Sequence, residues 1–550
     1  MFLIRLNKNK IHMQNIVILL LLCIIVFAPH FQKGIFRGLD DSFHLSRIYS
    51  LSQSIRNGVF PVKVHSYMCY GTGYGAGFGY SNFFAYIPAL LICLGFSLTQ
   101  SYKIYVFMIL ITLSLVAYYS LFCLTKKASA SLIGCIIILL SNRIWWDIYG
   151  LMSLGSLQAS VFILPAIIGM YRFLIDEDVH PKMLSIGFIG LIYSHTISAF
   201  LTFTVCACLV VCFCGKLIKN KKKMKELIFA VVFVLGVTTA FWLPLIEQMK
   251  KQLLKVNMPW TTAEQNVESI DSMLSIRGLG LMPMLMLIFS VIVLLYLKTR
   301  KRYLFHELYK KSCFGLIAVV YIILTMCYPF WHFMNSVVGI TIIQFPYRLY
   351  TPVTFLCAVQ VAILIPDISI GNTNRKLMAL LGSALTFALV FIQYNHYGEL
   401  FGKIDNSIVE AVENNSIAGI GGGEEWLPAN GKREYMIDTE IAIDNDGNKV
   451  KGTKSEGYSV YTVTIDTGKD YYDLPYVYYK GYQAIGENGT DYEVELNYDT
   501  GMLRMLIPSD LSGTDKITVT YVGTKYQKLA YLITLCALCI GGIFIKKEWL

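Results

Sequence analysis

Residues 101–124 read SYKIYVFMILITLSLVAYYSLFCL, and this stretch decides the class of the protein. Its one charged residue is Lys103. A helix needs about 20 apolar residues to cross the hydrocarbon core of a bilayer, so the stretch predicts a membrane span. The whole chain of 550 residues agrees, because 55% of it is hydrophobic, 15% is charged and its mean hydropathy is +0.54. Soluble proteins carry roughly 25% charged residues, which excludes a soluble multidomain protein.

Further apolar runs lie on both sides of this one. The first, Asn15 to Pro29, follows basic residues and precedes no small-residue cleavage site, which predicts an uncleaved span with a cytoplasmic N-terminus. The run 183–215 is too long for one span and has a polar middle, Ser194-His195-Thr196, which predicts two short helices that meet there. The predicted runs are 15–29, 101–124, 129–146, 152–173, 183–215, 226–246, 277–297, 313–330, 348–366, 376–394 and 528–545.

The apolar segment 83–98 is not predicted to cross the membrane. Cytoplasmic loops are enriched in Lys and Arg, and the basic clusters of this chain all face the cytoplasm only if 83–98 stays on one side. The segment is also short and carries Pro88, so we expect an interfacial or half-inserted helix. This leaves about twelve spans, with both termini in the cytoplasm. The net charge of +11 sits in these clusters and does not indicate nucleic acid: Lys126-Lys127, Arg172 with Lys182, Lys216 to Lys225, Lys298 to Arg302, Arg375-Lys376 and Lys546-Lys547.

The composition changes abruptly at 395–527. Gly, Asp and Tyr rise there, cysteine is absent, and alternation replaces the long apolar runs. Tyr458 to Ile465 and Lys516 to Val522 predict strands, while Asn445-Asp446-Gly447 and Glu487-Asn488-Gly489 predict hairpin turns. The region is therefore expected to be a β-sandwich.

These patterns predict three parts. A transmembrane domain covers 1–394, and its first outward loop with interfacial helices covers 31–98. The β-sandwich at 395–527 is extracytoplasmic, and 528–550 form a C-terminal anchor with a cytoplasmic tail. The expected fold class is a polytopic α-helical membrane protein with a C-terminal extracytoplasmic β-sandwich.

Polar residues near the predicted outer ends of the spans indicate a functional site, because ionisable groups at membrane depth are costly and tend to be functional. Asp40 and His44 are four residues apart at the start of a segment with helical periodicity, which places both on one helix face. Simple capping of a helix N-terminus is the alternative for this pair. The full set is Asp40, Asp41, His44, Asp147, His195, His332, Gln344 and Arg348.

The glycine run Gly71-Thr-Gly-Tyr-Gly-Ala-Gly-Phe-Gly79 does not match a nucleotide-binding fingerprint. Ala76 and Phe78 occupy the required positions, and no strand precedes the run. We interpret it as a pliable lid whose aromatic residues could touch a sugar or a lipid, with an ordinary flexible loop as the alternative.

Distinct short motifs lie along almost the whole chain: Asp40-x-x-x-His44-Leu-Ser-Arg47, Gly58-x-x-Pro61, Gly73-Tyr-Gly75, the aromatic run to Pro88, Asp147-Ile-Tyr149, Ser194-His195, Gln344-Phe-Pro-Tyr-Arg348, Glu425-Trp-Leu-Pro428 and Tyr479-Lys-Gly-Tyr482. In order and spacing they resemble a bacterial multipass family labelled pyruvoyl-tetrahydropterin-synthase-related, which belongs to the GT-C glycosyltransferase superfamily. Two departures stand out. Leu151-Met152 replaces an Arg-Gly step of that family, and Gln158 replaces a glutamate, so one acid is missing here.

The resemblance implies a GT-C-like membrane domain of about 12 spans in the bacterial cell membrane. It also implies an inverting glycosyltransferase that moves a sugar from a polyprenyl-phosphate donor to a cell-envelope glycan or teichoic-acid-like acceptor. Nucleotide sugars stay in the cytosol, so a site on the outer face needs a donor that a lipid has carried across. The expected partners are this donor, the glycan acceptor and the lipid bilayer, without nucleic acid.

In this scheme Asp40 is the general base, a role worth about 10²–10⁴-fold in rate, and Asp41 is its alternative. Asp147 either orients the acceptor or holds a divalent metal ion. Metal use is left open, and no other cofactor is expected. Arginine suits phosphate oxygens, so the substrate-binding set is led by the guanidinium: Arg348, His195, His44 and Gln344.

Two alternatives remain. A transporter or flippase for a lipid-linked glycan would place its charged groups through the interior, whereas those of this chain gather at one predicted face, and no pair of broken helices recurs in its two halves. A non-catalytic scaffold that binds envelope polymer through the β-domain is favoured by the Gln158 departure.

Overall fold

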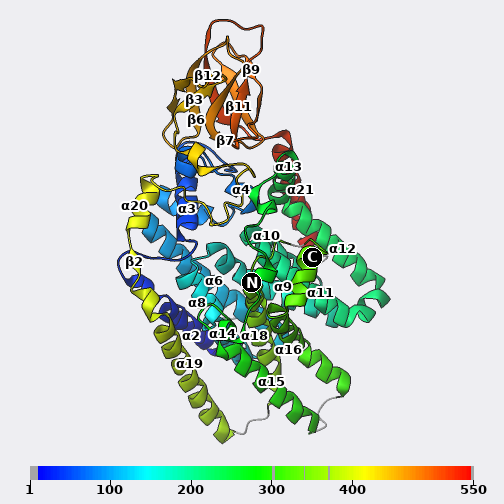
Figure 1. Cartoon of the computed structure of the whole chain (residues 1–550). Helices are drawn as coiled ribbons and strands as arrows, with labels where there is room; N and C mark the ends of the chain where they lie inside the picture. The colour runs from blue at the N-terminus through cyan, green and yellow to red at the C-terminus, as the bar shows by residue number, and fades with distance from the viewer. Residues whose placement is uncertain (1–9, 300–303, 340, 369–371, 547–550) are drawn as a thin grey trace.

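The computed structural model describes residues 10–299, 304–339, 341–368 and 372–546. Helices fill the larger part of the molecule, and the strands of the two larger sheets gather at one end of it, above α3 (Asp41–Arg56) and α4 (Ala76–Gly79) (Figure 1). The chain ends at 1–9 and 547–550, on which the predicted cytoplasmic termini fall, lie outside the described residues.

Within the described residues, seven helices are long and apolar enough to cross a membrane. The number rises to nine if two bent pairs each count as one span: α7 (Ala128–Leu139) with Asn142–Gly150, bent by 46°, and α12 (Lys221–Val237) with α13 (Thr239–Lys251), bent by 70°. The count of about twelve stays a prediction. The seven are α2 (Lys10–Phe27) continued by η1 (Ala28–Phe31), α6 (Leu98–Thr125), α9 (Leu154–Ile175), α11 (Thr196–Lys219), α15 (Leu281–Thr299), Glu307–Thr325 of α16 (Phe305–Thr325), and Pro346–Asp367 around α18 (Tyr350–Leu364).

The predicted break in 183–215 is confirmed. α10 (Lys182–Ser194) and α11 meet at His195, whose extended backbone (φ −156°, ψ 113°) interrupts the helix. Only α10 is short, because α11 continues to Lys219. α5 (Tyr86–Cys93) occupies the segment 83–98 and has eight residues, or about 12 Å of helix. It is too short for a hydrocarbon core of about 30 Å, and its side of the membrane stays a prediction.

α9 and α18 form the centre of the bundle. In each, 83% of the most apolar stretch is buried inside the protein, against 33% for α15. Short helical turns lead into both helices: α8 (Asn142–Trp145) and η3 (Trp146–Gly150) before α9, and η6 (Pro346–Leu349) before α18. Residues in these turns therefore lie where two central helices begin.

The C-terminal β-rich region contains two five-stranded antiparallel sheets whose buried side chains share one core. In β12, buried and exposed residues alternate, which is the pattern that predicted the strand. One sheet has the order β10 (Val494–Leu496), β11 (Met502–Leu506), β7 (Tyr471–Val477), β3 (Ile441–Asp444), β4 (Lys449–Lys451). The other has the order β5 (Thr453–Lys454), β6 (Val460–Asp466), β12 (Thr514–Tyr521), β8 (Tyr482–Gly486), β9 (Asp491–Tyr492).

Both predicted hairpin turns are present. Gly447, between β3 and β4, and Gly489, between β8 and β9, adopt positive φ angles of 82° and 83°. A glycine adopts such angles without the steric cost that a Cβ atom brings, which is why these positions signalled turns.

The connection between the two parts differs from the predicted boundary at 395. α19 (Asn372–Phe401) runs past it, and the strands of the sandwich begin only at Ile441. Between them, β2 (Ile404–Asp405) pairs with β1 (Ile35–Phe36), and α20 (Ser407–Glu413) packs against α3 (Asp41–Arg56). The first loop and this connection are thus joined. The remaining helices are α4 (Ala76–Gly79), α14 (Ile270–Leu274), α17 (Tyr328–Ser336) and α21 (Lys525–Lys546), of which α21 packs along α12 and α13.

The glycine run 71–79 is not a pliable lid, because every residue in it is buried. A Cβ atom on Gly75 would lie 2.4 Å from the ring of Tyr479, and one on Gly79 would lie 1.8 Å from the ring of Trp426. The glycines therefore allow aromatic rings from the C-terminal part to press on the backbone. The run is a packed junction between the first loop and the β-rich region.

Candidate functional site

Asp40 stands directly before α3 and is tied to the turn that leads into α9. Its backbone N–H donates to the carbonyl of Leu151 over 2.9 Å, and the N–H of Leu39 donates to the carbonyl of Gly150 over 3.2 Å. The Asp40 carboxylate makes no capping hydrogen bond to α3. Within the described part of the chain it has no hydrogen bond or ion pair at all, although it is half-buried. Capping therefore does not explain this acid.

The pKa of Asp40 is raised to about 6. Burial is the largest cause, and the negative charge of Glu425 is the second, while the guanidinium of Arg348 opposes both. Burial disfavours a charged carboxylate, and a nearby like charge disfavours it further. A carboxylate with this pKa is ionised at neutral pH yet accepts a proton more readily than an ordinary aspartate, as a general base must.

Asp41, the alternative base, is already bonded. Its Oδ2 accepts from Arg37 Nε over 2.6 Å and from the N–H of Gly38 over 3.3 Å, and its Oδ1 accepts from the N–H of Ser42 over 2.5 Å. A carboxylate held by three donors has less capacity to take a substrate proton. Asp41 holds the start of α3, and Arg37 extends the contact to Asp405 of β2.

Asp147 lies on η3 and is buried. Its Oδ1 accepts from Arg143 Nη2 over 3.2 Å and its Oδ2 from Ser156 Oγ over 2.8 Å. Both oxygens are thus engaged by groups that fix the turn before α9. No set of three or more His, Cys, Asp or Glu side chains among the described residues is arranged to hold a metal ion. Because both oxygens of Asp147 already accept hydrogen bonds, we assign this residue to positioning.

Arg348, unlike Asp147, keeps a buried side-chain atom without a hydrogen-bond partner. It lies on η6, its guanidinium carbon is 5.2 Å from the ring centre of Phe345, and its buried Nη1 has no hydrogen-bond partner. Its charge lowers the pKa of both Asp40 and His195, so it lies near both groups. A guanidinium without a carboxylate partner is suited to bind an anionic ligand through paired N–H groups.

Glu425 is a site residue that sequence reasoning did not select. Its backbone carbonyl accepts from the N–H of Val256 over 2.8 Å, which fixes the segment. Its side chain is half-buried and has no partner among the residues that the structure describes. The motif Glu425-Trp-Leu-Pro428 was a signal for it, but the position fell inside the predicted β-domain, far from the other acids in the sequence.

The rings of His44 and His195 both lie near the ring of Tyr80. The Tyr80 ring is 5.5 Å from that of His195 and 6.0 Å from that of His44, and the guanidinium of Arg47 lies 5.0 Å from it. Burial, and then the charge of Arg348, lowers the pKa of His195 to about 3. Burial likewise holds the pKa of His44 well below its usual range. Both imidazoles are neutral at physiological pH, so they can bind a phosphate only as hydrogen-bond donors and not as cations.

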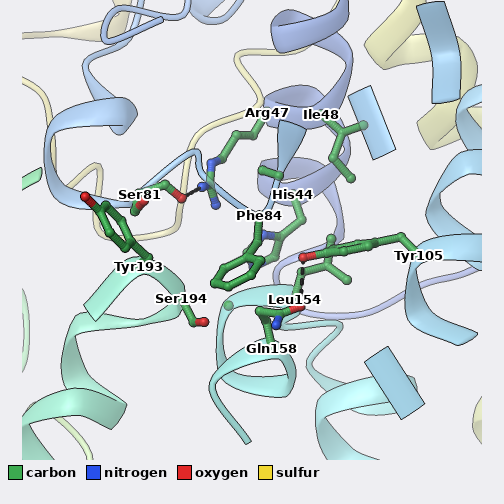
Figure 2. Close-up of a pocket in the computed structure, with 12 residues that line it drawn as sticks. His44, Arg47, Ile48, Ser81, Phe84, Tyr105, Leu154, Gln158, Tyr193 and Ser194 are labelled. Atoms are coloured by element: carbon green, nitrogen blue, oxygen red, sulfur yellow. Dashed lines mark hydrogen bonds between the residues drawn. The ribbon is translucent and has the colours of Figure 1, made fainter. Parts of the chain in front are cut away.

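A small, partly open cavity is lined by His44, Arg47 and Gln158 among other residues (Figure 2). Its volume of about 20 Å³ exceeds the roughly 10–15 Å³ that one water needs. Gln158 enters this cavity and its Oε1 accepts from the hydroxyl of Tyr105 over 3.0 Å, while Arg47 donates to Asn82 Oδ1 over 3.0 Å and to the carbonyl of Ser81. Gln158 thus supplies an amide and not a carboxylate to the cavity near His44 and Arg47. It leaves the Asp40 carboxylate in place.

Two residues of the predicted set are not brought to Asp40. His332, on α17, is 57% exposed and pairs with Glu264 over 2.9 Å. The backbone carbonyl of Gln344 accepts from Asn266 Nδ2 over 3.1 Å, and the described residues show no contact from its side chain to Asp40 or Arg348. The structure brings together Asp40, Asp147, His44, His195 and Arg348, and adds Glu425, Tyr80 and Arg47.

Comparisons with known proteins find similarity among solved structures. No family model matches the chain, so the resemblance to the pyruvoyl-tetrahydropterin-synthase-related family has no support from a family match. No curated protein matches it either. Among solved structures, it is similar to the oligosaccharyltransferase of Archaeoglobus fulgidus, crystallised tethered with an acceptor peptide containing the NVT sequon via a disulfide bond. The TM-score is 0.39 and the identity 12%, over 94% of this chain and 77% of that chain. A likeness of this size carries no argument, and the proposals below stand on the residues alone.

Proposed function

We propose that the protein is a membrane glycosyltransferase that moves a sugar from a polyprenyl-phosphate donor to a cell-envelope glycan on the outer face. One observation carries the proposal. A half-buried carboxylate with a raised pKa, Asp40, and a guanidinium with a buried, unpartnered nitrogen, Arg348, share a site without being bonded to each other. A half-buried carboxylate and a guanidinium nitrogen that both lack a partner are costly, and a reaction that uses both groups accounts for them.

The reaction is a single displacement with inversion. The acceptor hydroxyl oxygen attacks the anomeric carbon of the donor sugar while Asp40 takes the hydroxyl proton. The bond between that carbon and the phosphate oxygen breaks, and the phosphate leaves with the electron pair. Arg348 then balances the charge that develops on the departing phosphate, which is a form of electrostatic stabilisation.

Neighbouring residues set the properties of these two groups. Glu425 raises the pKa of Asp40 and offers carboxylate oxygens that can accept hydrogen bonds from sugar hydroxyls. Asp147, held by Arg143 and Ser156, fixes the turn to which the Asp40 backbone is bonded. His195 Nδ1 and Ser198 Oγ share a hydrogen bond of 2.8 Å, which leaves the imidazole Nε2 for a ligand.

Two features favour a lipid-linked sugar donor over a nucleotide sugar. The glycine run 71–79 lacks a nucleotide-binding fingerprint and is buried against Tyr479 and Trp426. By the positive-inside rule the basic clusters favour the outer side of the membrane for the site, where a lipid-linked sugar is the activated form at hand. A polyprenyl chain would reach the site laterally through the bilayer.

A deletion strain tests the proposal. The acceptor polymer should lose the mass of one sugar type, and the lipid-linked donor should accumulate on the outer leaflet. Wild-type protein should restore the polymer, and Asp40→Asn at equal abundance should not. Full complementation by Asp40→Asn would favour a non-catalytic scaffold, and accumulation confined to the inner leaflet would favour a flippase.

A further inference from the structure

A polar groove of about 400 Å³ lies between the β-rich region and the loop after α13, apart from the Asp40 site. Five of its lining side chains can contact a ligand through hydrogen bonds, charge or an aromatic face: Lys255, Asn430, Lys432, Tyr498 and Asp499. Its volume is within the roughly 300–1,000 Å³ of pockets that hold small ligands.

The groove has the chemistry of a saccharide site. Tyr498 is 70% exposed, an unusual position for a large aromatic ring, and its face offers a platform for the C–H face of a sugar. Asn430 Nδ2 donates to the Tyr498 carbonyl over 2.5 Å, which joins the two turns that form the wall. The exposed carboxylate of Asp499 has no partner in the described parts of the chain and can accept hydrogen bonds from hydroxyl groups.

The charges around the groove are balanced. Lys255 pairs with Glu424 over 2.5 Å, Arg433 pairs with the same carboxylate, and Lys432 lies 3.8 Å from Glu434. Together with Asp499, three acidic side chains face three basic ones. A polymer of phosphates binds through unpaired basic groups, and here the basic groups already have acidic partners. The groove therefore favours hydroxyl groups over phosphates.

The segment that lines the groove also carries Glu425 into the Asp40 site. Lys255 N–H donates to the Leu427 carbonyl over 2.9 Å, and Val256 N–H donates to the Glu425 carbonyl over 2.8 Å. The same loop ends in Trp260, which is 65% exposed and whose ring lies 5.9 Å from that of Phe345. Arg348 lies over that Phe345 ring. The groove residue Lys255 and the exposed Trp260 thus lie on one loop, and Trp260 contacts the Phe345 ring over which Arg348 lies.

We infer that this groove is a subsite that holds the acceptor, and that the acceptor is an uncharged saccharide chain, not a polyanion of the teichoic-acid type. The inference rests on the proposed function, which it deepens by naming the acceptor class. A chain held at Tyr498 and guided past Trp260 would present its end to Asp40.

The test uses the full-length protein in nanodiscs. Binding of cellohexaose, maltohexaose and chitohexaose, and separately of poly(glycerol phosphate), is measured by saturation-transfer NMR. We expect wild-type protein to bind at least one neutral oligosaccharide, with little dependence on salt. Tyr498→Ala should weaken this binding about tenfold, since an aromatic contact is lost. Tyr498→Trp should retain it, because it keeps the ring face, and Asp438→Ala, a change at an exposed acid outside the groove, should leave it unchanged.

The possible outcomes distinguish an error in the groove assignment from an error in the acceptor class or in the proposed transferase activity. Binding that survives Tyr498→Ala, or no binding of any neutral oligosaccharide, would overturn the groove assignment. Salt-sensitive binding of poly(glycerol phosphate) alone would overturn the acceptor class. The transferase proposal fails separately: if Asp40→Asn kept near wild-type transfer while glycan binding was still lost in Tyr498→Ala, the groove would stand and the proposed base would not. Tyr498→Ala should raise KM for the acceptor and leave kcat intact.

Discussion

Two acid–arginine neighbourhoods lie close together in this protein and have opposite properties. Arg143 and Asp147 are both buried and directly bonded, with side chains 3% and 0% exposed. Asp40 and Arg348 are half-buried and make no bond to each other. The same two chemical groups hold a turn in one place, and in the other, under the proposed function, they meet a substrate. The difference lies in hydrogen bonding. A bonded pair already uses its donors and acceptors, whereas an unbonded pair can offer them to a ligand.

The largest expected effect is on the bonded pair. Asp147→Ala should leave the Arg143 guanidinium buried without its carboxylate, which costs about 3–5 kcal/mol of stability. Thermal unfolding of the purified protein in detergent should show a clear loss of Tm. Replacing both partners, as in Arg143→Met with Asp147→Leu, should recover most of it, because no uncompensated charge is then buried. A double variant as unstable as Asp147→Ala would show that this pair is not a self-contained structural unit.

The second effect separates the unbonded acid from its bonded neighbour. Asp40→Asn keeps the shape and removes the proton acceptor, so transfer should fall by about 10²-fold or more, equivalent to roughly 2.7 kcal/mol, with unchanged membrane insertion. Asp41→Asn should cost far less transfer, because that carboxylate is held by Arg37, Gly38 and Ser42. Acceptor modification is measured in membranes at matched protein levels. Near wild-type transfer by Asp40→Asn would remove it as the base, and equal losses would mean that the wrong neighbour was chosen.

Arg348→Lys should have an intermediate effect, on the order of tenfold in transfer. The ammonium keeps the charge and loses the paired N–H groups that match a phosphate. The loss should be larger in kcat than in KM for the acceptor, since the contact strengthens as the phosphate departs. Arg348→Lys that raised only the acceptor KM would place this guanidinium on the acceptor side of the site.

The smallest effect concerns pH. Asp40 acts as a base only when ionised, and its pKa is about 6, so kcat/KM should fall as the pH drops through about 6. Glu425 raises that pKa by its negative charge, so Glu425→Gln should move the acidic limb to lower pH. Glu487→Gln, at an exposed acid in the β8–β9 turn, is the matched control and should leave the profile in place. A limb that does not move would separate Glu425 from the base.

Much of the fold could be predicted from local patterns. Apolar runs of sufficient length gave the central helices, the polar step at His195 gave the break between α10 and α11, and glycine turns gave the two hairpins. Asp40 and Arg348 could be selected because ionisable residues near membrane spans are rare and costly. Each of these signals lies within a short window of sequence.

What the sequence by itself determined is therefore the set of elements and the residues able to do chemistry. Only the tertiary structure decided which of these residues are buried, hydrogen-bonded or left without a partner. Asp40 and Asp41 are adjacent and chemically alike, and contacts alone leave one free and bind the other. Glu425 joins Asp40 from a segment far along the chain, and the glycine run became a packed junction because Tyr479 and Trp426 fill the space its missing side chains leave. Periodicity is a property of neighbours in sequence, whereas burial, pairing and pKa depend on whichever groups the packed chain places next to them.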